Sequence, residues 1–179
     1  MTIEDVELLF ENSKARMVAK RSCPEIEIAG EKIGAFEEGD EFQARVWVGS
    51  VLSELGLADF QDEDQLNLVG LHKVFWKEGI QNGKRLSMLP EFFYPKLRRF
   101  LSDLKKKSHD DPSLVVEYGK ARRLAQDVLN CRLKKIVGLA AAPAQTGDIL
   151  ESMTPEERDL YDQMSRVIRN WESKIVKIS

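Results

Sequence analysis

Apolar residues recur every three or four positions along most of this chain, which is the spacing of helices with one buried face. The pattern predicts a first helix that ends near Asn12, with Thr2 and Asp5 as a capping pair at its start. Helical spacing returns in residues 45–56, where Gly56 is placed to end the helix in a left-handed conformation. Between these two helices the pattern changes.

Short segments that alternate apolar and polar residues, as strands do, lie between the two helices. They are residues 15–20, 25–30 and 31–36, and glycines such as Gly30 mark the turns between them. These segments predict one small β-sheet. The helix at 45–56 can cover its open face.

Longer amphipathic helices are predicted from Asp59 onward. The first has acidic residues at its start, where the positive end of the helix dipole favours them. Its expected apolar side consists of Leu68, Leu71, Phe75 and Trp76. Residues 81–85 form a predicted turn, and a lead-in with two prolines precedes a helix over about 95–107.

Two capped helices complete the pattern. Asp111 is the predicted cap of a long helix, with Pro112 at its favoured first position. A predicted loop at 140–148 follows, and Thr154 with Glu157 then forms a capping box for the last helix. The apolar side of this last helix consists of Leu160, Met164, Val167, Ile168, Trp171 and Ile175.

The predicted fold is therefore mainly α with a small α+β module. Residues 1–58 form the small β-rich domain, and residues 59–179 form an antiparallel helical bundle. The chain shows no internal repeat and no low-complexity tract.

Composition adds charge polarity to this picture. The 179 residues are 42% hydrophobic, which suffices for a packed core, and the net charge is −3. Residues 1–70 hold 16 acids and 6 bases, whereas residues 71–179 hold 14 acids and 21 bases. The absence of a long apolar run, together with the wide separation of Cys23 and Cys131, predicts an intracellular, cytoplasmic protein.

Reactive residues do not converge in the sequence. His72 and His109 stand apart from any second ligand at metal spacing, and no phosphate-binding or nucleophile motif is present. We therefore expect no catalysis, no metal and no cofactor.

Aromatic residues are crowded into two neighbouring segments, where they either fill a core or anchor an interface. The helices carry more apolar surface than a slim bundle hides, which favours an obligate oligomer. The predicted subunit interface comprises Trp47, Phe75, Trp76, Phe92, Phe93, Tyr94, Leu97, Leu124, Val128 and Ile136.

Basic residues are concentrated between Lys96 and Lys135, and they raise the alternative of a DNA-binding module. The competing interpretation is that they form the solvated sides of amphipathic helices, because stacking aromatics are not interleaved with them. The candidate DNA contacts are Lys105, Lys106, Lys107, Arg122 and Arg123.

Five segments in a particular order resemble the archaeal subunits of the GINS DNA replication complex. They are "PEIEIAGEKIG" at 24–34, "VWVGSVLSELG" at 46–56, "LPEFFYPKL" at 89–97, "RLKKIVGLA" at 132–140 and "TPEERDLY" at 154–161. The family has two subunit types that carry a helical A domain and a small β-rich B domain in opposite order. With the small module first, this chain resembles the type akin to the second and third partner-of-Sld-five subunits.

The resemblance implies a non-catalytic scaffold in the replicative helicase assembly at replication forks, associated with the nucleoid. It implies a hetero-tetramer with two copies each of this chain and a complementary GINS subunit. The implied partners of the tetramer are the MCM helicase motor and a RecJ-like protein of the nuclease family.

Overall fold

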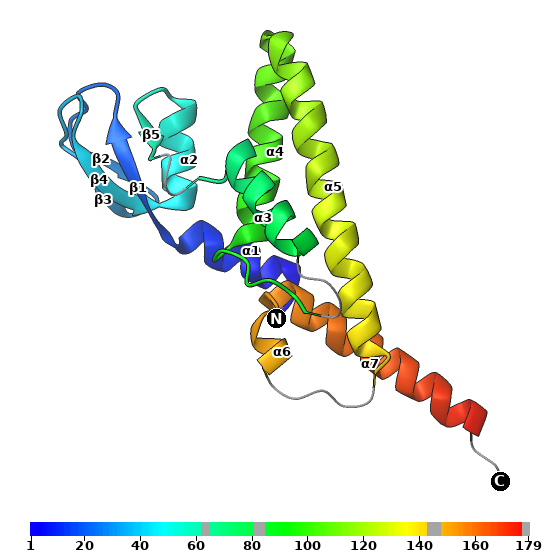
Figure 1. The fold of residues 1–179 in the computed structure, drawn as a ribbon. Coiled ribbons are helices and arrows are strands. Elements are labelled where there is room, and N and C mark those ends of the chain that lie inside the picture. Colours follow the sequence, from blue (N-terminus) through cyan, green and yellow to red (C-terminus); the bar gives the residue numbers. More distant parts are fainter. Residues whose placement is uncertain (62–64, 81–84, 143–147, 177–179) are drawn as a thin grey trace. The chain divides into compact units, whose positions relative to one another are not determined.

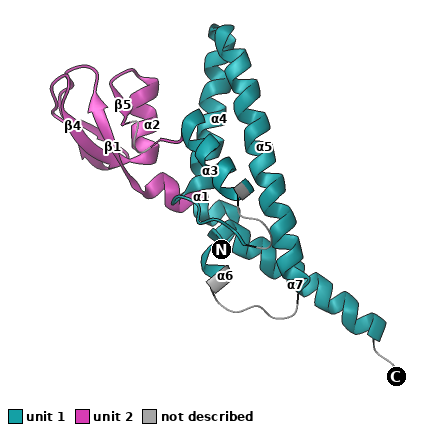
Figure 2. Ribbon diagram, viewed as in Figure 1, with its two compact units in different colours: residues 1–6, 67–179 teal, residues 7–66 magenta. Residues whose placement is uncertain are grey.

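The computed structural model describes residues 1–61, 65–80, 85–142 and 148–176 (Figure 1). It divides into unit 1, residues 1–6 and 67–179, and unit 2, residues 7–66 (Figure 2). Helix α1 (Ile3–Asn12) opens the chain with the predicted capping box. In it the Thr2 backbone N–H donates to Asp5 Oδ2 at 2.9 Å, and the Asp5 backbone N–H donates to Thr2 Oγ1 at 3.2 Å.

Unit 2 is built on strand β1 (Lys14–Ala19), which lies at the centre of a three-stranded antiparallel sheet. Its neighbours are β4 (Glu41–Arg45) on one side and β5 (Ala58–Phe60) on the other. Because β5 pairs with β1, residues up to 66 belong to this unit, and the division falls later in the chain than the predicted boundary after residue 58.

Strands β2 (Ile26–Ile28) and β3 (Glu31–Ile33) form a separate two-stranded hairpin. The prediction that all the alternating segments join in one sheet was therefore wrong. The strands that pair with β1 come from two segments further along the chain, and a local alternation pattern does not encode that choice of partner.

Helix α2 (Val46–Glu54) packs against this sheet and closes its face, as predicted. Val48, Leu52 and Met17 are fully buried. A Cβ atom at Gly49 would lie 2.6 Å from Phe60 Cζ, so only glycine allows this close approach. Gly56 follows the C-cap residue Leu55, and its φ of +67° and its N–H hydrogen bond to the Ser53 carbonyl confirm the predicted stop.

Unit 1 contains helices α3 (Leu68–Ile80), α4 (Phe93–Asp110), α5 (Ser113–Ala140), α6 (Asp148–Glu151) and α7 (Pro155–Val176). Helix α5 packs against α3, α4 and α7, and it forms a long antiparallel pair with α4 (Figure 1). The predicted cap at Asp111 is confirmed, because the Ser113 backbone N–H donates to its Oδ1 at 2.9 Å.

The buried face of α3 differs from the predicted one. Leu71, Val74 and Glu78 point inward, whereas Phe75 and Trp76 are exposed. The predicted helix start near Asp59 was also wrong, because Asp59 belongs to strand β5 and α3 begins only at Leu68, with no acidic residue in its first turn. Asn67 caps this start, since its Oδ1 accepts a hydrogen bond from the Gly70 backbone N–H. The predicted turn at 81–85 and the loop at 140–148 lie mostly outside the described residues.

Candidate functional site

Arg132 occupies a position on α5 that helical spacing assigns to the apolar face. It lies four residues from Val128 and four from Ile136, and both of these side chains are buried. Arg132 itself is 1% exposed. A guanidinium always carries its charge, so at this depth it must find acceptors for its N–H groups.

Two carboxylates supply these acceptors. Arg132 Nε donates to Glu157 Oε1, and Arg132 Nη2 donates to Glu157 Oε2 at 2.7 Å, which gives a two-pronged contact. Arg132 Nη1 donates to Glu78 Oε2 at 2.7 Å and to the Ser87 carbonyl oxygen at 2.8 Å. All three guanidinium nitrogens are therefore engaged.

Glu78, on the inner face of α3, is held by further donors. Lys135 Nζ, one turn of α5 away from Arg132, donates to Glu78 Oε1 and to its backbone oxygen. The hydroxyl and the backbone N–H of Ser87 both donate to Glu78 Oε2. Two carboxylates thus meet two cations, and the buried charge balances.

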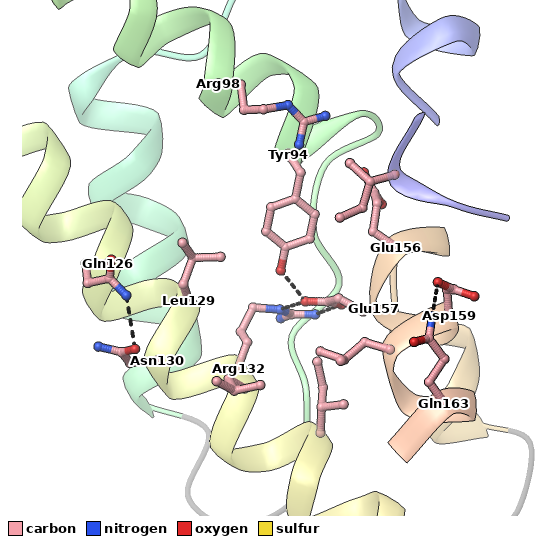
Figure 3. A pocket seen from close by; sticks show the side chains of 14 residues that line it. Tyr94, Arg98, Gln126, Leu129, Asn130, Arg132, Glu156, Glu157, Asp159 and Gln163 are labelled. Carbon is pink, nitrogen blue, oxygen red and sulfur yellow. Dashed lines mark hydrogen bonds and ion pairs between the residues drawn. The ribbon is translucent and has the colours of Figure 1, made fainter. Parts of the chain in front are cut away.

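Glu157 lies in the first turn of α7, where the helix dipole favours a carboxylate. It completes the predicted capping box, because the Thr154 backbone N–H donates to Glu157 Oε2 at 3.1 Å and the Glu157 backbone N–H donates to Thr154 Oγ1 at 3.3 Å. The Tyr94 hydroxyl, from α4, donates to Glu157 Oε1 (Figure 3). We call Glu78, Ser87, Tyr94, Arg132, Lys135 and Glu157 the ionic cluster.

The ionic cluster shifts the pKa values of Arg132 and Glu78 in the direction that keeps each of them charged. Burial works against the charges of Arg132 and Glu78, but the hydrogen bonds outweigh it. The pKa of Arg132 is raised by its bonds to Glu157, and the pKa of Glu78 is lowered by Lys135, Ser87 and Arg132. Burial and the adjacent Glu157 raise the pKa of Tyr94, so its hydroxyl stays a donor.

The ionic cluster ties α3, α4, α5 and α7 to one another. Its charged groups form ion pairs with one another. The ionic cluster is therefore suited to hold the helices in position rather than to transfer protons to a substrate. Within the described part of the chain, no group of three or more His, Cys, Asp or Glu side chains is placed to hold a metal ion.

A groove of about 500 Å³ opens beside the ionic cluster, between α4, α5 and α7 (Figure 3). Tyr94, Arg132 and Glu157 form part of its lining, and Leu129 and Leu133 of α5 with Leu160 of α7 add apolar wall. The remaining lining residues are Ile3, Arg98, Gln126, Asn130, Ile136, Glu156, Asp159 and Gln163.

Apolar side chains continue from the groove along α7. Val167, Trp171 and Ile175 are 69%, 63% and 65% exposed, and with Leu160 they form what we call the α7 stripe. The predicted apolar side of this helix is therefore divided. Met164 and Ile168 pack against the core of unit 1, and the α7 stripe faces outward.

The ten side chains of the predicted subunit interface are found in three environments. Half of them are buried within unit 1 of this chain, so their side chains are not open to a partner in this fold: Phe93, Leu97, Leu124, Val128 and Ile136. Trp47, Phe92 and Tyr94 are half-buried, and Tyr94 belongs to the ionic cluster. Phe75 and Trp76 are exposed on α3.

The five candidate DNA contacts are all exposed: Lys105, Lys106, Lys107, Arg122 and Arg123. Arg132 and Lys135, which belong to the same basic stretch of sequence, are instead used inside the bundle. Sequence reasoning missed this role. The sequence contains a signal for a buried Arg132, because this residue lies four positions from Val128 and four from Ile136, on the apolar face of the helix.

The model of the Sld5 family, described as the GINS complex protein helical bundle domain, matches residues 57–176. The match covers more than half of the chain, includes α3 to α7 and confirms the resemblance seen in the sequence. A search of curated proteins found no match. None of the described helices is long and apolar enough to cross a membrane.

Arg132→Met should destabilise unit 1 by about 3–5 kcal/mol, because it leaves two buried carboxylates without their shared cation. Urea unfolding followed by circular dichroism measures this loss. Lys134→Met, at an exposed position on the same helix, is the matched control and should change the free energy of unfolding by less than about 0.5 kcal/mol. Equal effects of the two substitutions would contradict the role given to Arg132.

Acid should weaken unit 1 through Glu78. The folded-state pKa of Glu78 lies below its ordinary value of 4.5, so its stabilising contribution is complete above that pH and is lost as the pH falls through the folded value. The free energy of unfolding measured from pH 6 down to pH 3 should therefore fall less steeply in Glu78→Gln than in the unchanged protein. Glu172→Gln, at an exposed site on α7, should keep the original slope.

Proposed function

Since this chain belongs to the GINS family of DNA replication proteins, we propose that it is a non-catalytic structural subunit of a GINS-like tetramer in the replicative helicase assembly. The family match over residues 57–176 carries this proposal. Members of the family are structural replication factors. The ionic cluster supports the same role, because it holds helices in place and presents no free reactive group.

The proposed tetramer contains two copies of this chain and two copies of a complementary GINS subunit that carries its two domains in the opposite order. It links the MCM motor to a RecJ-like partner at the replication fork. The order of the domains supports this assignment, since a small β-containing unit precedes the helical bundle as in one of the two subunit types.

Exposed apolar residues on α3 offer a surface for the complementary subunit. Val69 and Trp76 are well exposed and seven residues apart, which places them on one side of the helix, and Phe75 is partly exposed nearer the buried face. Large apolar side chains in such a position are costly to leave in water, and aromatic residues anchor many interfaces. We assign the contact with the complementary subunit to this α3 surface.

Sedimentation velocity of the chain mixed with its complementary subunit should show a stable tetramer. Trp76→Glu should weaken binding of the complementary subunit by more than about tenfold, because it buries a charge in an apolar contact. Glu172→Gln on α7 serves as a control and should leave binding unchanged. A mixture in which the two chains sediment independently would refute the proposed assembly.

DNA binding is the second candidate function. All five candidate DNA contacts are exposed on the paired helices α4 and α5, so their charges are accessible to phosphates. Phosphate contacts of this kind lose affinity steeply as salt is added, whereas apolar subunit contacts do not.

Replacing Lys105, Lys106 and Lys107 together by Ser tests this second function. If these side chains bind phosphates, DNA affinity of the purified assembly should fall, and the slope of log affinity against log salt should decrease by about 0.9 for each phosphate that the protein no longer neutralises. Fluorescence anisotropy with labelled DNA at several salt concentrations measures both quantities. Unaltered affinity and slope would exclude DNA binding by this cluster.

A further inference from the structure

The C-terminal half of α7 extends beyond the end of α5 (Figure 1). The α7 stripe continues along this half of the helix. Leu160, Val167, Trp171 and Ile175 are seven, four and four residues apart, which keeps them on one side of the helix. A helix of 22 residues is long enough to form a two-helix contact by itself. This surface is separate from the α3 surface assigned to the complementary subunit.

Charges along α7 are divided between its two ends. The first half carries the acidic residues Glu156, Asp159 and Asp162 against the single base Arg158, while Glu157 is buried in the ionic cluster. The second half carries the basic residues Arg166, Arg169 and Lys174 against the single acid Glu172. A parallel pair of such helices would place like charges together, whereas an antiparallel pair sets the acidic half of each helix beside the basic half of the other.

We propose that α7 pairs with α7 of a second copy of this chain in an antiparallel, twofold-symmetric contact through the α7 stripe. The twofold axis passes near Val167. In this arrangement Leu160 of each copy lies opposite Ile175 of the other, so one set of residues supplies both sides of the contact. The inference rests on the proposed role of the chain in an assembly, and it names the element that joins its two copies.

The groove beside the ionic cluster fits this pairing. Leu160 lines the groove together with Leu129 and Leu133 of α5, and the pairing brings Trp171 and Ile175 of the second copy toward this apolar wall. The groove thus receives the end of the helix that extends beyond α5 in the other copy. The proposed pairing of the two α7 helices would therefore cover both the groove and the exposed apolar end of α7.

Glu156 and Lys174 supply the polar edge of the contact. They are eighteen residues apart, which is five turns of 3.6 residues, so they lie on the same side of α7. Glu156 lines the groove, and its Oε1 is buried with no hydrogen-bond partner. With Leu160 opposite Ile175, Lys174 of the second copy lies about five residues from Glu156, or roughly 7.5 Å along the helix, a distance that these two long side chains can span. Symmetry makes the same pair twice.

The first test measures self-association of the full chain alone by sedimentation equilibrium. The unchanged chain should be a dimer, and Trp171→Glu with Ile175→Glu should raise the dissociation constant by more than about a hundredfold. Trp76→Glu is the matched control, an equally exposed tryptophan on α3, and should leave the dimer intact. A monomeric unchanged chain at micromolar concentrations, or equal losses in both variants, would overturn the proposal.

Charge reversal tests the polar edge. Glu156→Lys and Lys174→Glu should each raise the dissociation constant by roughly three- to tenfold, and the double variant should restore it. Circular dichroism confirms that each variant is folded. Additive losses in the double variant would contradict the pairing of these two side chains.

Cross-linking with a short thiol reagent tests the direction of pairing, in a chain with Cys131→Ala. Val167→Cys, near the axis, should link to its own copy. Ile175→Cys should not, because its two copies lie roughly 24 Å apart at about 1.5 Å of rise per residue. Mixed Leu160→Cys and Ile175→Cys chains should link to each other. Efficient linkage of Ile175→Cys to itself would indicate parallel helices and overturn the proposal.

Addition of the complementary subunit separates this inference from the proposed function. The double variant Trp171→Glu with Ile175→Glu should still bind the complementary subunit, but the complex should contain only one copy of each chain. Trp76→Glu should no longer bind the complementary subunit, but it should still form the dimer of this chain. If the chain dimerises through α7 and ignores the complementary subunit, only the proposed function fails. If the α7 double variant still assembles into the full tetramer, only the α7 contact fails.

Discussion

The buried guanidinium of Arg132 is the constraint on which the helical unit depends. An ion in a protein interior is tolerated only when charged partners and hydrogen bonds replace the water around it. These partners come from α3 and α7, and Tyr94 adds α4 through Glu157. A purely apolar interface would allow helices to slide at modest cost, whereas this network has full hydrogen bonding in one arrangement only. The helices therefore have a defined register.

The packing of three helices around α5 explains which side chains of α3 and α7 remain exposed. Helix α5 contacts α3, α4 and α7, so each of these helices buries the side that faces α5. Glu78 takes an inward position on α3, and Trp76 on the same helix stays exposed. On α7, Tyr161, Met164 and Ile168 pack inward while the α7 stripe faces outward. A protein with apolar surface on two separate helices is suited to bind more than one partner, as a subunit of an assembly does.

Unit 2 is held together by different interactions. Its core is a small antiparallel sheet covered by α2, with Met17, Val48 and Leu52 fully buried, and it has no counterpart of the ionic cluster among its described residues. Gly49 lets α2 approach Phe60 closely enough to seal this core. The unit is acidic in sequence, in contrast to the more basic bundle, so the two units offer partners surfaces of opposite charge.

The amino-acid sequence by itself determined the caps and most ends of the helices, the order of a small β-containing unit before a bundle, and the family. Caps such as Thr154 with Glu157 depend on residues three positions apart, so a local pattern contains them completely. The tertiary structure decided the rest. Arg132 binds Glu78, which is 54 residues away along the chain, and Glu157, which is 25 residues away. Strand β1 pairs with two strands that lie beyond the nearest alternating segments. Such pairings depend on three-dimensional packing, and so does the choice of which apolar side of α3 and α7 is buried and which is left for a partner.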